Sequence, residues 1–125
     1  MRSTVRADSA RCTLAAFHRP RFSSGEEYGD DDVESFSYDL SGNGRSQILK
    51  TQGFVKLVRR KGGPVIGVHI VGSRAGELIG EAQLIYNWEA FPEDVAQLVH
   101  MHPTQNEALG EAHLALAGKP LHAHS

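Results

Sequence analysis

The sequence is poor in cysteine, in long apolar runs and in excess charge. Cys12 is the single cysteine among its 125 residues, so neither an internal disulfide nor a metal cage of cysteines can form within this chain. No apolar run approaches the roughly 18–20 residues that a membrane span requires. The formal net charge is −2 and the pI is about 6.4, which implies no general affinity for nucleic acid or for an anionic membrane. A cytoplasmic or organelle-matrix location is expected.

Recognisable nucleotide-binding loops are also missing. A G-x-G-x-x-G loop would need a third glycine after Gly42-x-Gly44, but Gln47 stands at that position. The same stretch lacks the lysine and the spacing of a P-loop. These glycines therefore predict a plain loop.

What the sequence does contain is one domain of ordinary size, preceded by a basic segment. Residues 1–24 hold five arginines against a single acid, Asp8, and their apolar residues follow neither the helical nor the strand period. A disordered or non-homologous segment is the preferred interpretation. An organelle transit peptide is the alternative, although Pro20 and the few aliphatic residues make a poor amphipathic helix. The domain itself is expected to comprise residues 25–125.

Three strands are predicted in the first half of this domain. Apolar residues alternate in Val33–Leu40 and recur densely in Gly53–Arg60 and Val65–Val71, patterns that are typical of strands. The short turn Lys61–Gly63 favours an antiparallel hairpin between the second and third of them.

After the strands, apolar residues recur at the three- and four-residue spacing of helices. Ser73, Pro92 and Thr104 are predicted to begin three helices, because these residue types favour the first positions of a helix. The second helix should bury Leu98 and Val99. Strands followed by helices predict an α+β domain in which the helices pack on one face of an antiparallel sheet.

The run His102-Pro103-Thr104-x-x-Glu107 carries the most chemical information. An imidazole held by a carboxylate is a general base suited to neutral pH. Thr104 and Glu107 also have the spacing of a capping box, which would satisfy free N–H groups at a helix start. The two interpretations are compatible, since a glutamate near a helix N-terminus stays ionised.

Other histidines are candidates for metal binding. His100 pairs with His102, and His122 with His124, in two H-x-H patterns, and imidazole suits zinc or nickel. No aspartate, glutamate or cysteine completes either pair at a recognisable spacing, so no specific metal site is expected. His113 is expected on the outward face of the last helix.

Four motifs occur in a fixed order along the domain: Gly53–Leu57, Gly67–Gly72, Gly76–Ala82 and His102–Glu107. Together they resemble the C-terminal dimerisation domain of the pyridine nucleotide-disulfide oxidoreductases, in particular those of the dihydrolipoyl dehydrogenase type. The resemblance runs from about Gly25 to the C-terminus.

The resemblance implies a mechanism. Complete members of the family are flavoprotein homodimers that oxidise a dithiol through an active-site disulfide, FAD and then NAD. Their C-terminal domain supplies a histidine, oriented by a glutamate, to the partner subunit. On this basis His102 would accept the proton of dihydrolipoamide and Glu107 would hold its ring. His102 and Pro103 would lie near the partner's flavin, joined by a cis peptide bond, and a 2-oxo acid dehydrogenase complex would be the larger partner.

The chain departs from the family in its redox parts. The family's Cys-x-x-x-x-Cys is missing, because Cys12 is followed five places later by Phe17. Domains for FAD and NAD are not encoded in these residues, and the arginine-rich segment stands where the family has the first strand of this domain. We therefore expect the isolated chain neither to bind FAD or NAD stably nor to turn over dihydrolipoamide. A self-associating binding module without catalysis is the alternative.

Overall fold

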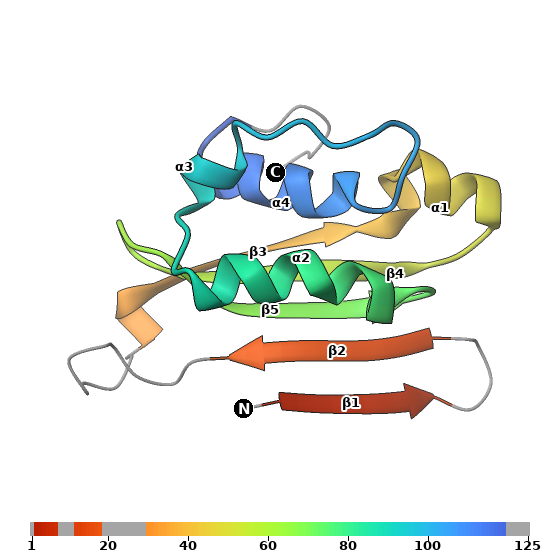
Figure 1. Cartoon of the computed structure of the whole chain (residues 1–125), viewed down its shortest axis with the longest axis horizontal. Coiled ribbons are helices and arrows are strands. Elements are labelled where there is room, and N and C mark those ends of the chain that lie inside the picture. Colours follow the sequence, from red (N-terminus) through yellow and green to blue (C-terminus); the bar gives the residue numbers. More distant parts are fainter. Residues whose placement is uncertain (1, 8–11, 19–29, 120–125) are drawn as a thin grey trace.

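The computed structural model of the chain describes residues 2–7, 12–18 and 30–119. Within these ranges one antiparallel sheet is covered on one face by helices (Figure 1). The sheet has five strands in the order β1-β2-β5-β4-β3. This arrangement confirms the predicted α+β class with helices packed on one face.

The strands precede the longer helices, as expected, but the short helix α1 lies between β3 and β4, where the sequence predicted only a loop. The strands are β1 (Arg2–Ala7), β2 (Cys12–His18), β3 (Val33–Asp39), β4 (Gly53–Arg60) and β5 (Val65–Gly72). The helices are α1 (Gly44–Leu49), α2 (Ala75–Asn87), α3 (Pro92–Val95) and α4 (Glu107–Leu116), with short 3-10 turns η1 (Asp30–Asp32) and η2 (Leu40–Gly42). No helix of the described residues is long and apolar enough to cross a bilayer.

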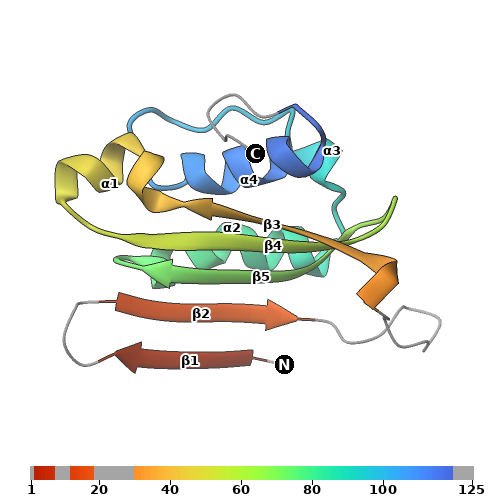
Figure 2. The ribbon, with the colours of Figure 1, turned by 180° about the vertical axis from the view of Figure 1, so that it is seen from behind.

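The core lies between the sheet and the two longer helices. Val55 stands opposite Ile70, and Leu57 opposite Val68, in the antiparallel pairing of β4 with β5. All four side chains are fully buried, because α2 packs over β5 and β2 while α4 packs over β3 and β4. Figure 2, seen from behind, shows the strands in front of α2 with no helix on the near face of the sheet.

The start of α2 differs from the prediction. Arg74, with φ 63°, occupies the position before the first helical residue, and no side chain caps the helix. Ser73 therefore lies one residue too early, and its predicted capping role is wrong.

Two predictions for the second half of the domain are also wrong. Helix α3 ends at Val95, so the helical spacing does not continue to Leu98 and Val99. These side chains are 60% and 95% exposed rather than buried. The last helix begins at Glu107, three residues after Thr104.

The N-terminal segment was expected to be disordered or non-homologous, and two stretches of it form strands. Residues 2–7 form β1 and residues 12–18 form β2, which pairs with β5 from His18 opposite Gly67 to Thr13 opposite Gly72. Strand pairing uses backbone groups, so the free edge of β5 can be extended by a segment without a clear apolar alternation. The remaining residues of that segment lie outside the described ranges, and whether residues 1–24 are homologous to other dimerisation domains stays a prediction.

Candidate active site

The chain segment between α3 and α4 carries the candidate base and runs over the outer side of α4 (Figure 1). Its His102–Pro103 peptide bond is cis, as the resemblance implied. At the following turn the Thr104 hydroxyl donates a hydrogen bond to the Met101 carbonyl, at 2.6 Å. The segment therefore has a defined local geometry rather than a simple extended path.

Helix α1 supports this segment from a distant part of the sequence. Asn43 caps α1 by accepting a hydrogen bond from the Ser46 amide at 3.0 Å, and its side-chain amide donates to the Thr104 carbonyl at 2.9 Å. Gln105 donates to the Ser46 hydroxyl at 3.3 Å. The sequence predicted only a loop here, although asparagine is one of the residues that commonly cap the start of a helix.

The predicted contact between His102 and Glu107 is present. Nδ1 of His102 lies 2.9 Å from Oε1 of Glu107, and Oε2 accepts a hydrogen bond from the Thr104 amide at 3.0 Å. Because a carboxylate can only accept, Nδ1 carries the hydrogen and Nε2 keeps its lone pair in the neutral ring. The His102 side chain is 77% exposed, so this lone pair is open to a group from outside the chain.

Only one half of the capping box forms. Glu107 accepts from the backbone amide of Thr104, as a capping box requires. The Thr104 hydroxyl, however, donates to Met101 instead of accepting from the first turn of α4. One carboxylate oxygen of Glu107 thus binds the imidazole, and the other binds the backbone of the turn.

Exposed apolar side chains precede the candidate base in the same segment. Leu98, Val99 and Met101 are 60%, 95% and 76% exposed. Beside them is a cavity of about 320 Å³ that is lined by Leu98, Val99 and Leu114 together with titratable groups including Glu107. Exposed apolar side chains that are grouped in this way are typical of a binding interface.

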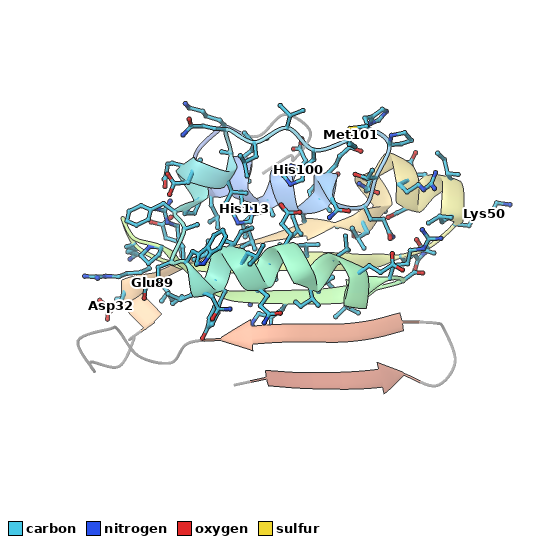
Figure 3. All side chains as sticks on the ribbon, in the orientation of Figure 1. Asp32, Lys50, Glu89, His100, Met101 and His113 are labelled. Atoms are coloured by element: carbon cyan, nitrogen blue, oxygen red, sulfur yellow. The ribbon has the colours of Figure 1, made fainter. Side chains whose placement is uncertain are left out.

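A second histidine of the segment is turned inward. Nε2 of His100 lies 2.6 Å from Oε1 of Glu81 in α2, and its side chain is only 13% exposed. The hydrogen bond to Glu81 raises the pKa of His100, against the opposing effect of burial. In Figure 3, His100 lies in the helical layer and Met101 on the outer loop.

His113 is fully buried, so its predicted outward position is wrong. Helix α4 packs on the sheet with one side, and the segment between α3 and α4 covers its other side (Figure 1). Little of the helix surface near His113 is therefore exposed to solvent. Nδ1 of His113 donates to the Leu109 carbonyl at 2.6 Å. Burial lowers the pKa of His113 to about 4, so the ring is neutral at physiological pH.

This fold and these motifs can be compared with known proteins. The family model described as the dimerisation domain of pyridine nucleotide-disulphide oxidoreductases matches residues 24–113. The chain belongs to this family.

Curated relatives of this dimerisation domain include dihydrolipoyl dehydrogenases. The enzyme of Corynebacterium glutamicum is 37% identical over 95 residues, which cover 74% of this chain and 20% of that protein. The mitochondrial dihydrolipoyl dehydrogenase 2 of Arabidopsis thaliana is 44% identical over 82 residues, which cover 64% of this chain and 16% of that protein. The chain thus spans at most about a fifth of the length of these relatives.

Solved structures show the same fold. LpdA from Mycobacterium tuberculosis matches with a TM-score of 0.76 and 25% identity, over 93% of this chain and 25% of that one. The matched 93% of this chain exceeds what residues 25–125 alone could supply. The match therefore includes part of the N-terminal segment. The flavoprotein disulfide reductase RclA from Escherichia coli has a TM-score of 0.68 at 14% identity, over 81% of this chain and 23% of that one.

The geometry of the dimerisation domain also bears on metal binding. His100 and His102 are directed to different carboxylates, Glu81 and Glu107, so the two rings do not converge on one point. Within residues 2–7, 12–18 and 30–119, no group of three potential metal ligands comes together. His122 and His124 lie outside the described residues.

Proposed function

We propose that this dimerisation domain supplies His102 as a proton acceptor to the disulfide site of a partner subunit in a flavoprotein of the dihydrolipoyl dehydrogenase type. The single observation that carries the proposal is the exposed His102 ring, 77% open to solvent and held 2.9 Å from Glu107 through Nδ1. A base that is oriented from behind and open in front suits a reactive group of another chain. The names of the curated relatives support a dihydrolipoyl substrate.

The proposed chemistry is a thiol–disulfide exchange. Nε2 of His102 takes the proton of a substrate thiol, and the carboxylate of Glu107 stabilises the imidazolium that results. The thiolate attacks one sulfur of the partner's disulfide and releases the other sulfur as a thiolate. The second substrate thiol then attacks the mixed disulfide at the substrate sulfur and releases the cysteine sulfur. This step leaves an oxidised substrate and a reduced pair of cysteines.

The cofactors belong to the proposal as well. His102 and Pro103 are exposed and uncovered at the rim of the domain, which fits contact with the flavin of a partner subunit. FAD, if bound to the partner subunit, would supply the electron acceptor for the reduced cysteine pair, and NAD would supply the final acceptor. This chain has a single cysteine, so we expect the isolated chain to be inactive.

Complementation tests the proposal. The chain is mixed with a dihydrolipoyl dehydrogenase that lacks its own C-terminal domain, and NAD reduction by dihydrolipoamide is measured. We expect activity to return, to be lost with His102→Gln, and to persist with Lys61→Gln in the β4–β5 turn. Equal activity with His102→Gln would contradict the role of the base, and no activity with the natural chain would contradict the proposal as a whole.

A second candidate function is a self-associating module without catalysis, which the exposed Leu98, Val99 and Met101 favour. In sedimentation velocity, we expect the natural chain to form a dimer and Val99→Asp to shift it to monomer, because a charge cannot be buried in an apolar contact without a partner. A dimer that is unchanged by Val99→Asp would place the interface elsewhere. Association with a 2-oxo acid dehydrogenase complex and a cytoplasmic location remain predictions.

A further inference from the structure

One carboxylate binds the segment that carries His102 at two points, one before and one after this residue. Oε1 of Glu81 accepts from Nε2 of His100 at 2.6 Å, and Oε2 accepts from the side-chain amide of Asn106 at 3.2 Å. His100 precedes His102 by two residues, and Asn106 immediately precedes Glu107. The two hydrogen bonds of Glu81 therefore lie on either side of His102, and the second one is made by the residue next to Glu107.

Close packing leaves the ring of His100 little freedom. A Cβ atom added at Gly110 would lie 2.6 Å from Nδ1 of His100, so α4 approaches the ring only because residue 110 has no side chain. The His100 side chain is 13% exposed and that of Glu81 is 28% exposed. The contact lies mostly within the domain, between α2 and α4.

The charges strengthen this contact. Burial alone would raise the pKa of Glu81, but the hydrogen bonds from His100 and Asn106 and the charge of His100 lower it overall. The pKa of His100 is raised, first by the hydrogen bond to Glu81 and also by its charge and that of Glu107. Both directions favour an imidazolium–carboxylate pair, and hydrogen bonds between charged groups are about twice as strong as neutral ones.

We propose that Glu81 is a positioning residue for His102: by binding His100 and Asn106 it fixes the stretch between them, which carries the imidazole, and holds the residue that precedes Glu107. The inference rests on the proposed function, in which His102 is the base. Glu81 itself lies on α2, and its carboxylate accepts hydrogen bonds from His100 and Asn106. Its role is thus to act through the backbone of the segment, not on a substrate.

Nitrogen NMR of the imidazole rings in the full chain tests the inference without any activity. In the natural chain we expect neutral His102 to carry its hydrogen on Nδ1. In Glu81→Gln, the Nδ1 and Nε2 signals of His102 should shift toward each other as the ring loses its fixed partner, and the pKa of His100 should fall. A matched control is Glu77→Gln, since Glu77 on the same helix borders the segment across a cavity of about 160 Å³ and does not bind it within the described residues.

The test has a clear opposite outcome. If folded Glu81→Gln keeps the His102 signals of the natural chain while the pKa of His100 falls, the segment does not need Glu81 and the inference is wrong. If this variant does not fold, Asn106→Ala decides, because the Asn106 side chain makes no capping hydrogen bond to α4. Asn106→Ala should shift the His102 signals in the same direction, and unshifted signals would overturn the inference.

Complementation then separates the two proposals. Where the natural chain restores activity, Glu81→Gln should lower kcat and kcat/KM equally, by about tenfold to a hundredfold, because a misplaced base weakens the transition state and not substrate binding. A rise in KM at unchanged kcat would contradict a positioning role. Where the natural chain restores nothing, the proposed function fails, while the NMR comparison still decides whether Glu81 fixes the segment.

Discussion

Acid should weaken this fold through the buried imidazole of His113. The side chain is fully buried, and Nδ1 donates to the Leu109 carbonyl. A second proton would have to sit on Nε2, which has no hydrogen-bond partner among the described residues. Burial therefore lowers the pKa of His113 from 6.5 to about 4.

The sign and size of the effect follow from this pKa. Below pH 6.5 the unfolded chain takes up a proton on residue 113, while the folded chain stays neutral there until about pH 4. The unfolded state binds more protons in this range, so the free energy of unfolding falls as the pH falls. A difference of about 2.5 pKa units at 1.36 kcal/mol each amounts to about 3 kcal/mol. That is a large part of the roughly 5–15 kcal/mol that stabilises an ordinary domain.

Urea unfolding followed by circular dichroism, at fixed protein concentration and at pH values from 7 to 4.5, measures this loss. This pH range avoids the titration of the two carboxylates whose pKa values are lowered. Glu81 and Glu93 titrate below their ordinary pKa of 4.5, so the stability that they contribute is lost only at lower pH. His100 has a raised pKa, so its contribution is complete below pH 6.5 and lost only as the pH rises. His113→Leu replaces the ring by an apolar side chain of similar volume, so the free energy of unfolding of this variant should depend less on pH. Equal slopes for the natural chain and this variant would refute the reasoning.

Four further substitutions test the packing of the domain. Arg59 is 5% exposed and its guanidinium lies 2.7 Å from Glu93, so Arg59→Met should cost about 2–3 kcal/mol in urea unfolding, whereas Glu93→Gln at the half-exposed end should cost less than about 1 kcal/mol. Gly53 has φ +150° and an added Cβ would lie 1.9 Å from a carbonyl oxygen of β5, so Gly53→Ala should lower the stability by at least about 3 kcal/mol. Gly110→Ala should displace the ring of His100 and lower its pKa in an NMR titration, and an unchanged titration would show that α4 can move aside.

The strands were accessible from the sequence because their pattern is local. Val55 and Leu57 alternate with exposed residues of β4 and face the helices, so the strand period marks both the element and its buried side. The turn Lys61–Gly63 is short and glycine-rich, and it indicated the hairpin directly. The spacing of His102 and Glu107 across one turn likewise placed their side chains within reach of each other.

The remaining features depend on contacts between distant residues. Nothing local indicates that Asn43 binds the Thr104 carbonyl or that Glu81 binds His100, since 61 and 19 residues separate the partners. One signal was available for Glu81: it lies three residues after Leu78, next to the apolar stripe of α2, where an ionised group requires a partner. His113 was misplaced because its helix is covered on both sides, which the apolar period of α4 alone does not reveal.

Association and the proposed base chemistry depend on the same short segment. Leu98, Val99 and Met101 precede His102 and are exposed with it, so a partner that covers these apolar side chains brings its own groups next to Nε2 of the imidazole. A substitution on this outer side must therefore change binding and chemistry together. Glu81 reaches the segment from α2, within the domain. A change at Glu81 can therefore alter the aim of the base while the covering surface stays intact, and this separates the two roles.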